Sequence, residues 1–225
     1  MVRRDDHSSR VRTTLSGPET KNMTHYLRLH HDAILVGVGT AIADDPSLTC
    51  RYPGVSLDAQ PRPVVVDPHM RWDTYNSKVH SLAIEKKGKA PWVVHASQRS
   101  TSEAPATSGI EHLLVGKDGL QAPDDPSSPD LRHIEWHSIL KALSQKGIQS
   151  VMIEGGATII NDLLSKPNLV DSVIVTIAPT WLGQGGVAVS PIGKVRDGER
   201  VNAASLHGTV WRQFGHDAVL FGSLG

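Results

Sequence analysis

The 225-residue chain has one cysteine, no long apolar run and no excess of either charge. Because Cys50 is the only cysteine, an internal disulfide and a multi-cysteine zinc site are both excluded. The longest apolar run, residues 33–39, is far shorter than the roughly 20 residues that a membrane span requires. The 23 Lys and Arg residues balance the 23 Asp and Glu residues, which argues against a polyanion-binding protein. We therefore expect neither a membrane nor a nucleic acid as a partner.

The first residues of the sequence lack the apolar segment of a secretory signal. Residues 1–12 are mostly polar and charged, and Asp5 and Asp6 argue against an organelle transit peptide. We therefore expect a cytoplasmic protein. Residues 1–15 form an atypical polar N-terminal segment, and the pattern of the remaining sequence predicts a single domain over residues 16–225.

Short apolar runs rich in branched side chains recur along the sequence and predict buried strands. The predicted strands cover residues 33–38, 64–66, 92–94, 112–115, 151–153, 172–177, 208–214 and 218–221. Helical patterns lie at residues 17–31, 137–145 and 158–164. This alternation predicts an α/β fold with a mainly parallel central sheet flanked by helices. The last two strands leave no room for a helix between them, so they predict a C-terminal antiparallel hairpin at the sheet edge.

Polar residues mark the ends of these elements. Ser16 is the predicted N-cap of the first helix, and Glu19 follows at the position that closes a capping box. Two longer polar stretches, residues 97–108 and 118–129, predict surface loops of the same domain.

The strongest chemical signal is the sequence Val-Met-Ile-Glu-Gly-Gly-Ala-Thr at residues 151–158. Here a predicted buried strand leads through Gly155 and Gly156 into a helix. Glycines allow a sharp turn and a close approach of the backbone to a ligand, and the free amides of a helix N-terminus favour a phosphate. The arrangement suits the pyrophosphate of a nucleotide. A tight strand-to-helix turn without a ligand is the alternative.

A second informative stretch, residues 39–51, follows the first predicted strand as a polar loop. Ligands of doubly wound α/β proteins bind beyond the carboxyl ends of the strands, so this loop is expected to meet one. Asp44 or Asp45 can accept hydrogen bonds from a sugar or a base, and Arg51 can pair with a phosphate. A solvated Asp-Asp-Pro turn is the alternative interpretation.

Several common catalytic motifs are absent from the sequence. It has no Walker phosphate loop, and the pair Gly37-x-Gly39 lacks the third glycine of the dinucleotide-binding fingerprint. No Gly-x-Ser-x-Gly nucleophile elbow occurs. Among the twelve histidines, His133 and His137 enclose Ile-Glu-Trp, which is not the zinc-protease pattern, so no metal site is expected. Composition and spacing alone name no reaction.

Four stretches, taken in order, carry a family resemblance: Ser-Gly-Pro-Glu-Thr at 16–20, His-Asp-Ala-Ile-Leu-Val-Gly-Val-Gly-Thr at 31–40, Ala-Asp-Asp-Pro-Ser-Leu-Thr at 43–49 and Glu-Gly-Gly-Ala at 154–157. With them the chain resembles the diaminohydroxyphosphoribosylaminopyrimidine reductases of riboflavin biosynthesis, in particular the stand-alone fungal type. The resemblance implies a dihydrofolate-reductase-like fold and a homodimer. It also implies NADPH-dependent reduction of the ribosylamino group of a phosphorylated pyrimidine to a ribitylamino group.

The resemblance further implies a cofactor site. Thr40 and Asp44 match positions that contact the nicotinamide cofactor, and Val115 matches a further contact. The pyrophosphate loop of the family matches Gly155, Gly156, Ala157, Thr158 and Ile159. Ser97 and Arg99 follow a predicted strand, where their chemistry suits the adenosine 2′-phosphate of NADPH.

A substrate site is implied as well. Arg51 matches the arginine that holds the substrate phosphate, with Leu48 nearby, and Glu154 matches an acidic residue that faces the substrate. Hydride transfer to the opened ribosylamine also needs a proton, for which Asp44 and Glu154 are the candidate donors.

The polar start of the sequence departs from the family pattern. Family members normally begin with a buried strand and a Ser-Leu-Asp-Gly-like turn that helps to build the substrate site, and residues 1–12 match neither. Two alternatives to the native activity therefore stay open. One is a truncated or repurposed member that binds nucleotide without activity, and the other is a reductase of a different imine or carbonyl substrate.

Overall fold

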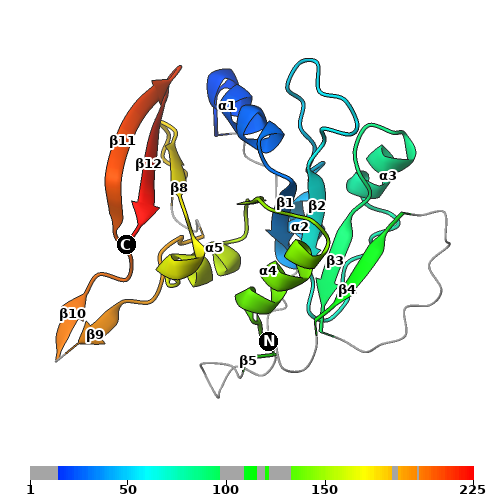
Figure 1. Ribbon diagram of the computed structural model, residues 1–225. Coiled ribbons are helices and arrows are strands. Elements are labelled where there is room, and N and C mark those ends of the chain that lie inside the picture. The colour runs from blue at the N-terminus through cyan, green and yellow to red at the C-terminus, as the bar shows by residue number, and fades with distance from the viewer. Residues whose placement is uncertain (1–14, 97–108, 116–119, 122–132, 184–186, 197) are drawn as a thin grey trace, which may run out of the picture.

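A five-stranded parallel sheet forms the centre of the computed structural model, which describes residues 15–96, 109–115, 120–121, 133–183, 187–196 and 198–225 (Figure 1). Its strand order is β4-β3-β2-β1-β7, and every neighbouring pair is parallel. The strands are β1 (Ala33–Gly37), β2 (Arg62–Val66), β3 (Trp92–His95), β4 (Glu111–Leu114) and β7 (Val151–Ile153). The predicted parallel sheet is confirmed, and each of these strands overlaps a predicted one.

Helices cover both faces of this sheet. Alternate side chains of β1 point to opposite faces. Ala33 and Leu35 pack in one apolar cluster with α4 (Trp136–Gln145) and α5 (Ala157–Leu164). Ile34 and Val36 pack in the other with α2 (Val38–Asp44) and α3 (Lys78–Ile84). Burial on both faces explains why the strand is a continuous apolar run and not an alternating one.

A second, three-stranded antiparallel sheet contains β8 (Val173–Ile177), β11 (Leu206–Phe214) and β12 (Asp217–Leu224), with β12 in the centre. The predicted hairpin is thereby confirmed, with β11 as an edge strand of this separate sheet. Its tight turn contains Gly215 at a φ of 60°, a backbone conformation that glycine adopts without strain. Figure 1 shows helix α1 (Pro18–Leu29) standing between this sheet and the parallel one.

The remaining elements are short. Two antiparallel ribbons pair β5 (Leu120–Gln121) with β6 (His133–Ile134) and β9 (Lys194–Arg196) with β10 (Glu199–Val201), and η2 (Pro167–Leu169) is a 3-10 turn. The predicted loop at 97–108 lies outside the described residues, and the loop at 118–129 is described only at β5. Within the described ranges, no helix has the length and apolar character to cross a bilayer.

The N-terminus of α1 differs from its prediction. The N-cap residue is Gly17, one position after Ser16, and it has no side chain for capping. Instead Asp217 of β12 accepts hydrogen bonds from the Thr20 hydroxyl, at 2.6 Å, and from the Gly17 amide, at 2.8 Å. These two donors lower the pKa of the Asp217 carboxyl below its ordinary value. The predicted capping box of Ser16 and Glu19 is therefore wrong, because a buried carboxylate from the hairpin occupies that role.

The segment predicted as a loop at residues 39–51 begins with a helix, α2, that follows β1 directly. Val38 and Ala41 lie one helical turn apart, and both are buried against the sheet. The helix has only seven residues and contains Gly39, so its sequence carries a weak helical signal. Residues 46–51, after it, are irregular, as predicted.

Candidate active site

The glycine turn and Thr40 meet at one edge of the parallel sheet. β1 and β7 are parallel neighbours, so the segments that follow their carboxyl ends lie side by side. A Cβ atom added to Gly155 would stand 3.2 Å from Cγ2 of Thr40, and one added to Gly156 would stand 3.1 Å from its Oγ1. Both glycines have positive φ angles, 68° and 82°. Only glycine fits here without strain, and the two predicted cofactor segments are in contact.

The shape of this turn fits a nucleotide pyrophosphate. Gly156 is the N-cap residue of α5, and no side chain caps that helix end. The amides at the start of α5 are therefore available to an anion, and the missing Cβ atoms allow its close approach. Ala157, Thr158 and Ile159 form the first turn of α5. Ile159 also packs on Gly37 of β1, where an added Cβ would come within 2.9 Å of its Cδ1.

The two neighbouring aspartates have different surroundings. Asp45 adopts a left-handed conformation at the end of α2, and its Oδ1 accepts a hydrogen bond from the Lys78 amide at 2.9 Å. Asp44 is exposed at the last position of α2, four residues after Thr40 and thus on the same helix face. Its carboxylate makes no hydrogen bond or ion pair with another described residue. Asp45 therefore shapes the chain, and Asp44 is the carboxylate available to a ligand.

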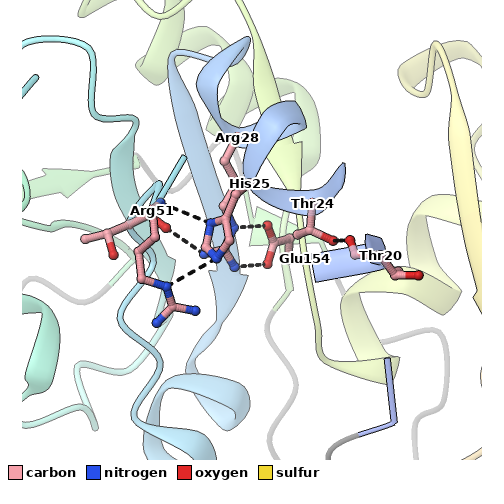
Figure 2. Close-up of polar contacts among 7 residues, drawn as sticks. Thr20, Thr24, His25, Arg28, Arg51 and Glu154 are labelled. Atoms are coloured by element: carbon pink, nitrogen blue, oxygen red, sulfur yellow. Dashed lines mark hydrogen bonds and ion pairs between the residues drawn. The ribbon is translucent and has the colours of Figure 1, made fainter. Parts of the chain in front are cut away.

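Glu154, directly before the glycine turn, is paired with Arg28 of α1 (Figure 2). The Arg28 Nε donates to Oε1 at 2.7 Å and Nη2 to Oε2 at 2.5 Å, while Nη1 donates to the Thr49 carbonyl at 2.8 Å. The two side chains are only 12% and 22% exposed. Such a two-point pair between planar groups fixes the orientation of both. All three guanidinium nitrogens of Arg28 are engaged, and they join α1, β7 and the loop after α2.

Arg51 contacts the same helix through His25 (Figure 2). The Arg51 Nε stands 3.2 Å from Nε2 of His25, and the Arg51 amide stands 3.2 Å from Nδ1. Burial is the main cause that lowers the pKa of His25 to about 4, and the positive charges of Arg28 and Arg51 lower it further. The imidazole is thus neutral near pH 7, whereas the Arg51 side chain is exposed.

Hydrogen bonds at Cys50 hold the loop that carries Arg51. The Gln60 side chain pairs with both backbone groups of Cys50, accepting from its amide and donating to its carbonyl, each at 2.8 Å. The buried Cys50 thiol donates to the His25 carbonyl at 3.0 Å. Leu48, predicted near the substrate, has a φ of 45° and is buried in the cluster beneath α2. These contacts give the loop one conformation around Arg51.

Not every predicted site residue lies beside the glycine turn. Val115 is buried just past the end of β4, which two strands, β3 and β2, separate from β1. Its amide donates to the His95 carbonyl at 2.9 Å. Ser97 and Arg99 lie outside the described residues. Within the described ranges, no group of three or more metal-ligating side chains is present.

His25 and Arg28 are site residues that the sequence interpretation missed. The helical spacing that predicts this helix runs through Met23, Tyr26, Leu27 and His30, but the buried residues of α1 are Thr20 and His25. A signal was present, since His25 and Arg28 lie three positions apart and therefore on one helix face. The partners of that face lie on distant segments, so spacing alone did not identify them.

Comparisons with known proteins relate the chain to one family. A family model described as the RibD C-terminal domain matches residues 4–220. The 2,5-diamino-6-ribosylamino-4(3H)-pyrimidinone 5′-phosphate reductase of Debaryomyces hansenii is 40% identical over 213 residues, which cover 92% of this chain and 79% of the relative. The protein of the same name from Eremothecium gossypii is 40% identical over 220 residues, covering 95% and 80%.

Solved structures show the same relationship. The riboflavin biosynthesis reductase Rib7 of Saccharomyces cerevisiae aligns with a TM-score of 0.74 at 35% identity, covering 94% of this chain and 83% of that one. RibD of Acinetobacter baumannii aligns with a TM-score of 0.66 at 22% identity, covering 95% and 52%, which shows a shared fold. The predicted fold class, dihydrofolate-reductase-like α/β, is confirmed.

Proposed function

The chain belongs to the RibD C-terminal domain family, and on that premise we propose how its residues reduce the ribosylamino group of a phosphorylated diaminopyrimidinone to a ribitylamino group. It is a reductase of riboflavin biosynthesis. One connected series of contacts supports the assignment of its site. Thr40 touches the glycine turn, Glu154 precedes that turn and pairs with Arg28, and His25 beside Arg28 contacts Arg51. The segments expected to hold cofactor and substrate are thus physically joined.

The cofactor assigned to the glycine turn is NADPH. Gly155, Gly156 and the first turn of α5 would hold its pyrophosphate, and Thr40 and Asp44 on α2 would face its nicotinamide half. The chemistry that NADPH supplies when bound is hydride transfer, which the protein promotes by fixing the position of the substrate carbon. The preference over NADH rests on Ser97 and Arg99 as a site for the 2′-phosphate, and Val115 is assigned to the adenosine half.

Arg51 is assigned to the substrate phosphate. Its guanidinium is exposed, and Nη1 and Nη2 make no hydrogen bond with the described part of the chain. A planar fork of this kind is suited to the oxygens of a phosphate. Leu48, three positions before Arg51, is assigned to the support of this loop, because its buried side chain keeps the backbone in place.

Of the two carboxylates that are candidates for proton delivery, we assign that role to Asp44. Both oxygens of Glu154 already accept hydrogen bonds from Arg28, which directs this side chain toward positioning. The exposed Asp44 is unengaged among the described residues and lies on the Thr40 face of α2. Asp44→Asn would lower kcat while leaving the affinity for the phosphorylated substrate nearly unchanged.

Titration of the purified protein with NADPH and NADH, followed by tryptophan fluorescence and calorimetry, tests the cofactor assignment. Tighter binding of NADPH supports it, and no binding of either would support a non-catalytic member. A turnover assay with the phosphorylated pyrimidine then separates the native reaction from reduction of another imine or carbonyl compound. Arg51→Ala should lower the affinity for the substrate far more than the affinity for the cofactor, whereas equal losses of affinity would contradict its role.

We also propose a homodimer that covers the antiparallel sheet. The edge strand β8 exposes Ile174, Val175 and Ile177, which point to both faces of the strand, and Trp181 just after it is 95% exposed. Val175 and Ile177 share one face of the strand, and exposed apolar side chains gathered on one face favour an interface. Sedimentation velocity at micromolar concentration should show a dimer that Val175→Glu dissociates. The matched variant Ile84→Glu, an exposed position on α3, should remain dimeric.

A further inference from the structure

We propose that His25 is a positioning residue, which holds the Arg51 guanidinium by its Nε so that the two Nη groups face the substrate phosphate. The inference rests on the proposed function, because it uses the assignment of Arg51 to that phosphate. It concerns a residue on helix α1, which precedes the loop of Arg51 in the sequence by more than twenty positions.

The position of His25 is itself fixed. Its side chain is buried on α1, and its backbone carbonyl accepts the hydrogen bond of the buried Cys50 thiol at 3.0 Å. Cys50 is the residue directly before Arg51, and Gln60 holds both of its backbone groups. The helix and the loop are therefore joined next to the contact between His25 and Arg51. Because its backbone is fixed in this way, the His25 side chain can define the direction of the Arg51 guanidinium.

Both ring nitrogens of His25 face donors of the same residue. Nε2 faces the Arg51 Nε and Nδ1 faces the Arg51 amide, each at 3.2 Å. A neutral imidazole has only one acceptor nitrogen, so it can accept from only one of these donors at a time. A charged donor forms the stronger hydrogen bond, which favours acceptance at Nε2 from the guanidinium. The Arg51 amide, which faces Nδ1, then has no acceptor on the ring.

This hydrogen bond leaves the useful part of Arg51 free. With Nε engaged, the plane of the guanidinium is fixed, and Nη1 and Nη2 make no other hydrogen bond in the described part of the chain. Arg28, one turn further along α1, has the opposite state, because Nε, Nη1 and Nη2 are all occupied by Glu154 and Thr49. Arg28 thus joins the segments of the site, and Arg51 is oriented with its Nη donors free. Ordering Arg51 before binding reduces the side-chain entropy that is lost when phosphate binds.

The charges around His25 keep it in the accepting state. Arg28 and Arg51 flank the ring, and Glu154 is the carboxylate that faces it. The two cations disfavour a charged imidazole, and a charged imidazole would have no acceptor for Arg51. Lys or Arg at position 25 would therefore repel the guanidinium, whereas a neutral acceptor would hold it.

Steady-state kinetics of the full chain with NADPH can test the proposal, using the phosphorylated substrate and its dephosphorylated form. His25→Phe keeps an aromatic ring and removes the acceptor, and His25→Gln keeps an acceptor. His30→Phe is a control at the exposed C-cap position of the same helix. We expect His25→Phe to raise KM for the phosphorylated substrate about tenfold without changing kcat. His25→Gln should recover most of that loss, and His30→Phe should behave like the unmodified protein. KM for the dephosphorylated substrate should not respond to any of them.

Arg51→Ala separates the two levels of the proposal. If it raises KM for the phosphorylated substrate, and the double variant His25→Phe/Arg51→Ala has the same KM as Arg51→Ala alone, His25 acts through Arg51. Suppose instead that Arg51→Ala raises this KM but His25→Phe does not, or that His25→Phe raises KM equally for the phosphorylated and dephosphorylated substrates. Either result overturns the role of His25, and the proposed function stands. If Arg51→Ala itself leaves KM unchanged, the phosphate assignment fails. Should His25→Phe not fold, His25→Asn, whose shorter side chain does not reach the guanidinium, replaces it.

Discussion

The guanidinium of Arg28 and the carboxylate of Glu154 meet edge to edge, with both oxygens bonded, across 126 positions of sequence. This pair joins helix α1 to the end of β7, directly before the glycine turn. Because both side chains are mostly buried, water cannot fully replace the hydrogen bonds and the opposite charge that either one loses when its partner is removed. The orientation of the glycine turn relative to α1 therefore depends on the pair.

A double-mutant cycle on this pair should show strong coupling. We expect Arg28→Met and Glu154→Gln each to lower the free energy of unfolding by about 2 kcal/mol, since each leaves a partly buried charged group without its partner. The double variant should lose clearly less than the sum of the two. Urea unfolding followed by circular dichroism measures the three variants, and strictly additive losses would show that the pair contributes nothing.

Gly156→Asp should abolish binding of NADPH. The substitution places a carboxylate and a Cβ atom where the turn approaches Thr40, at a φ of 82°. Gly147→Asp is the matched control, because Gly147 has a φ of 85° with no atom within 4 Å of an added Cβ. Both variants should lose about 1 to 2 kcal/mol of stability from backbone strain. Calorimetry should find NADPH affinity lost only in Gly156→Asp, and equal affinity in both would place the pyrophosphate elsewhere.

Stability should fall as the pH drops from about 6.5 to 4. His25 has its pKa lowered from 6.5 to about 4 in the fold, so the unfolded chain binds a proton in this interval that the folded chain does not. The full linkage would be about 3 kcal/mol, and because solvent screens the exposed Arg51 we expect about 1 to 2 kcal/mol. Chemical denaturation at a series of pH values measures this loss.

The matched comparison for the pH effect is His25→Gln, which should show a flatter profile over the same interval. Burial also lowers the pKa of His112, so part of the slope should persist in the variant. The carboxyls of Asp32 and Asp217 have pKa values lowered from 3.8, and their contribution should be lost only below that pH. Identical slopes for the two proteins between pH 6.5 and 4 would refute the assignment to His25.

Asp217→Asn should loosen the start of α1. Gly17 and Thr20 both donate to the same carboxylate oxygen, Oδ2, and a neutral amide oxygen is a weaker acceptor than a charged carboxylate oxygen, so asparagine replaces only part of this bonding. Hydrogen exchange should accelerate at the amides of the first turns of α1, while those of α3 remain unchanged. The denaturant midpoint should fall as well. Unchanged exchange at residues 18–24 would mean that the hairpin does not stabilise this helix.

Sequence alone predicted the parts of the fold whose signals are local. The run at residues 33–37 is apolar throughout because it is buried on both faces, and the close spacing of β11 and β12 predicted their hairpin. Thr40 and the glycine turn were each predicted to contact the cofactor, but their contact with each other depends on the pairing of β1 with β7, which only the structure shows. Helix α2 escaped prediction because a seven-residue helix with a glycine has little helical signal.

Long-range partners were not predictable in the same way. The caps and pairs of α1 involve Asp217, Glu154 and Arg51, and no spacing rule connects such distant positions. The inner face of α1 is polar because Thr20, His25 and Arg28 each contact a polar group from a distant segment. An apolar periodicity therefore identified the helix but not the face that it buries.

The cap that Asp217 supplies to α1 has a consequence for the order of assembly during synthesis. Gly17 leaves the ribosome 200 positions before Asp217. At ordinary rates of translation this is an interval of about 10 to 40 seconds. During that time the helix that carries His25 and Arg28 has been made but has no cap at its N-terminus. The first helix of the described chain is therefore capped only after one of its last strands has been synthesised. In a nascent chain that stalls before residue 217, His25 and Arg28 lie on a helix without its N-terminal cap.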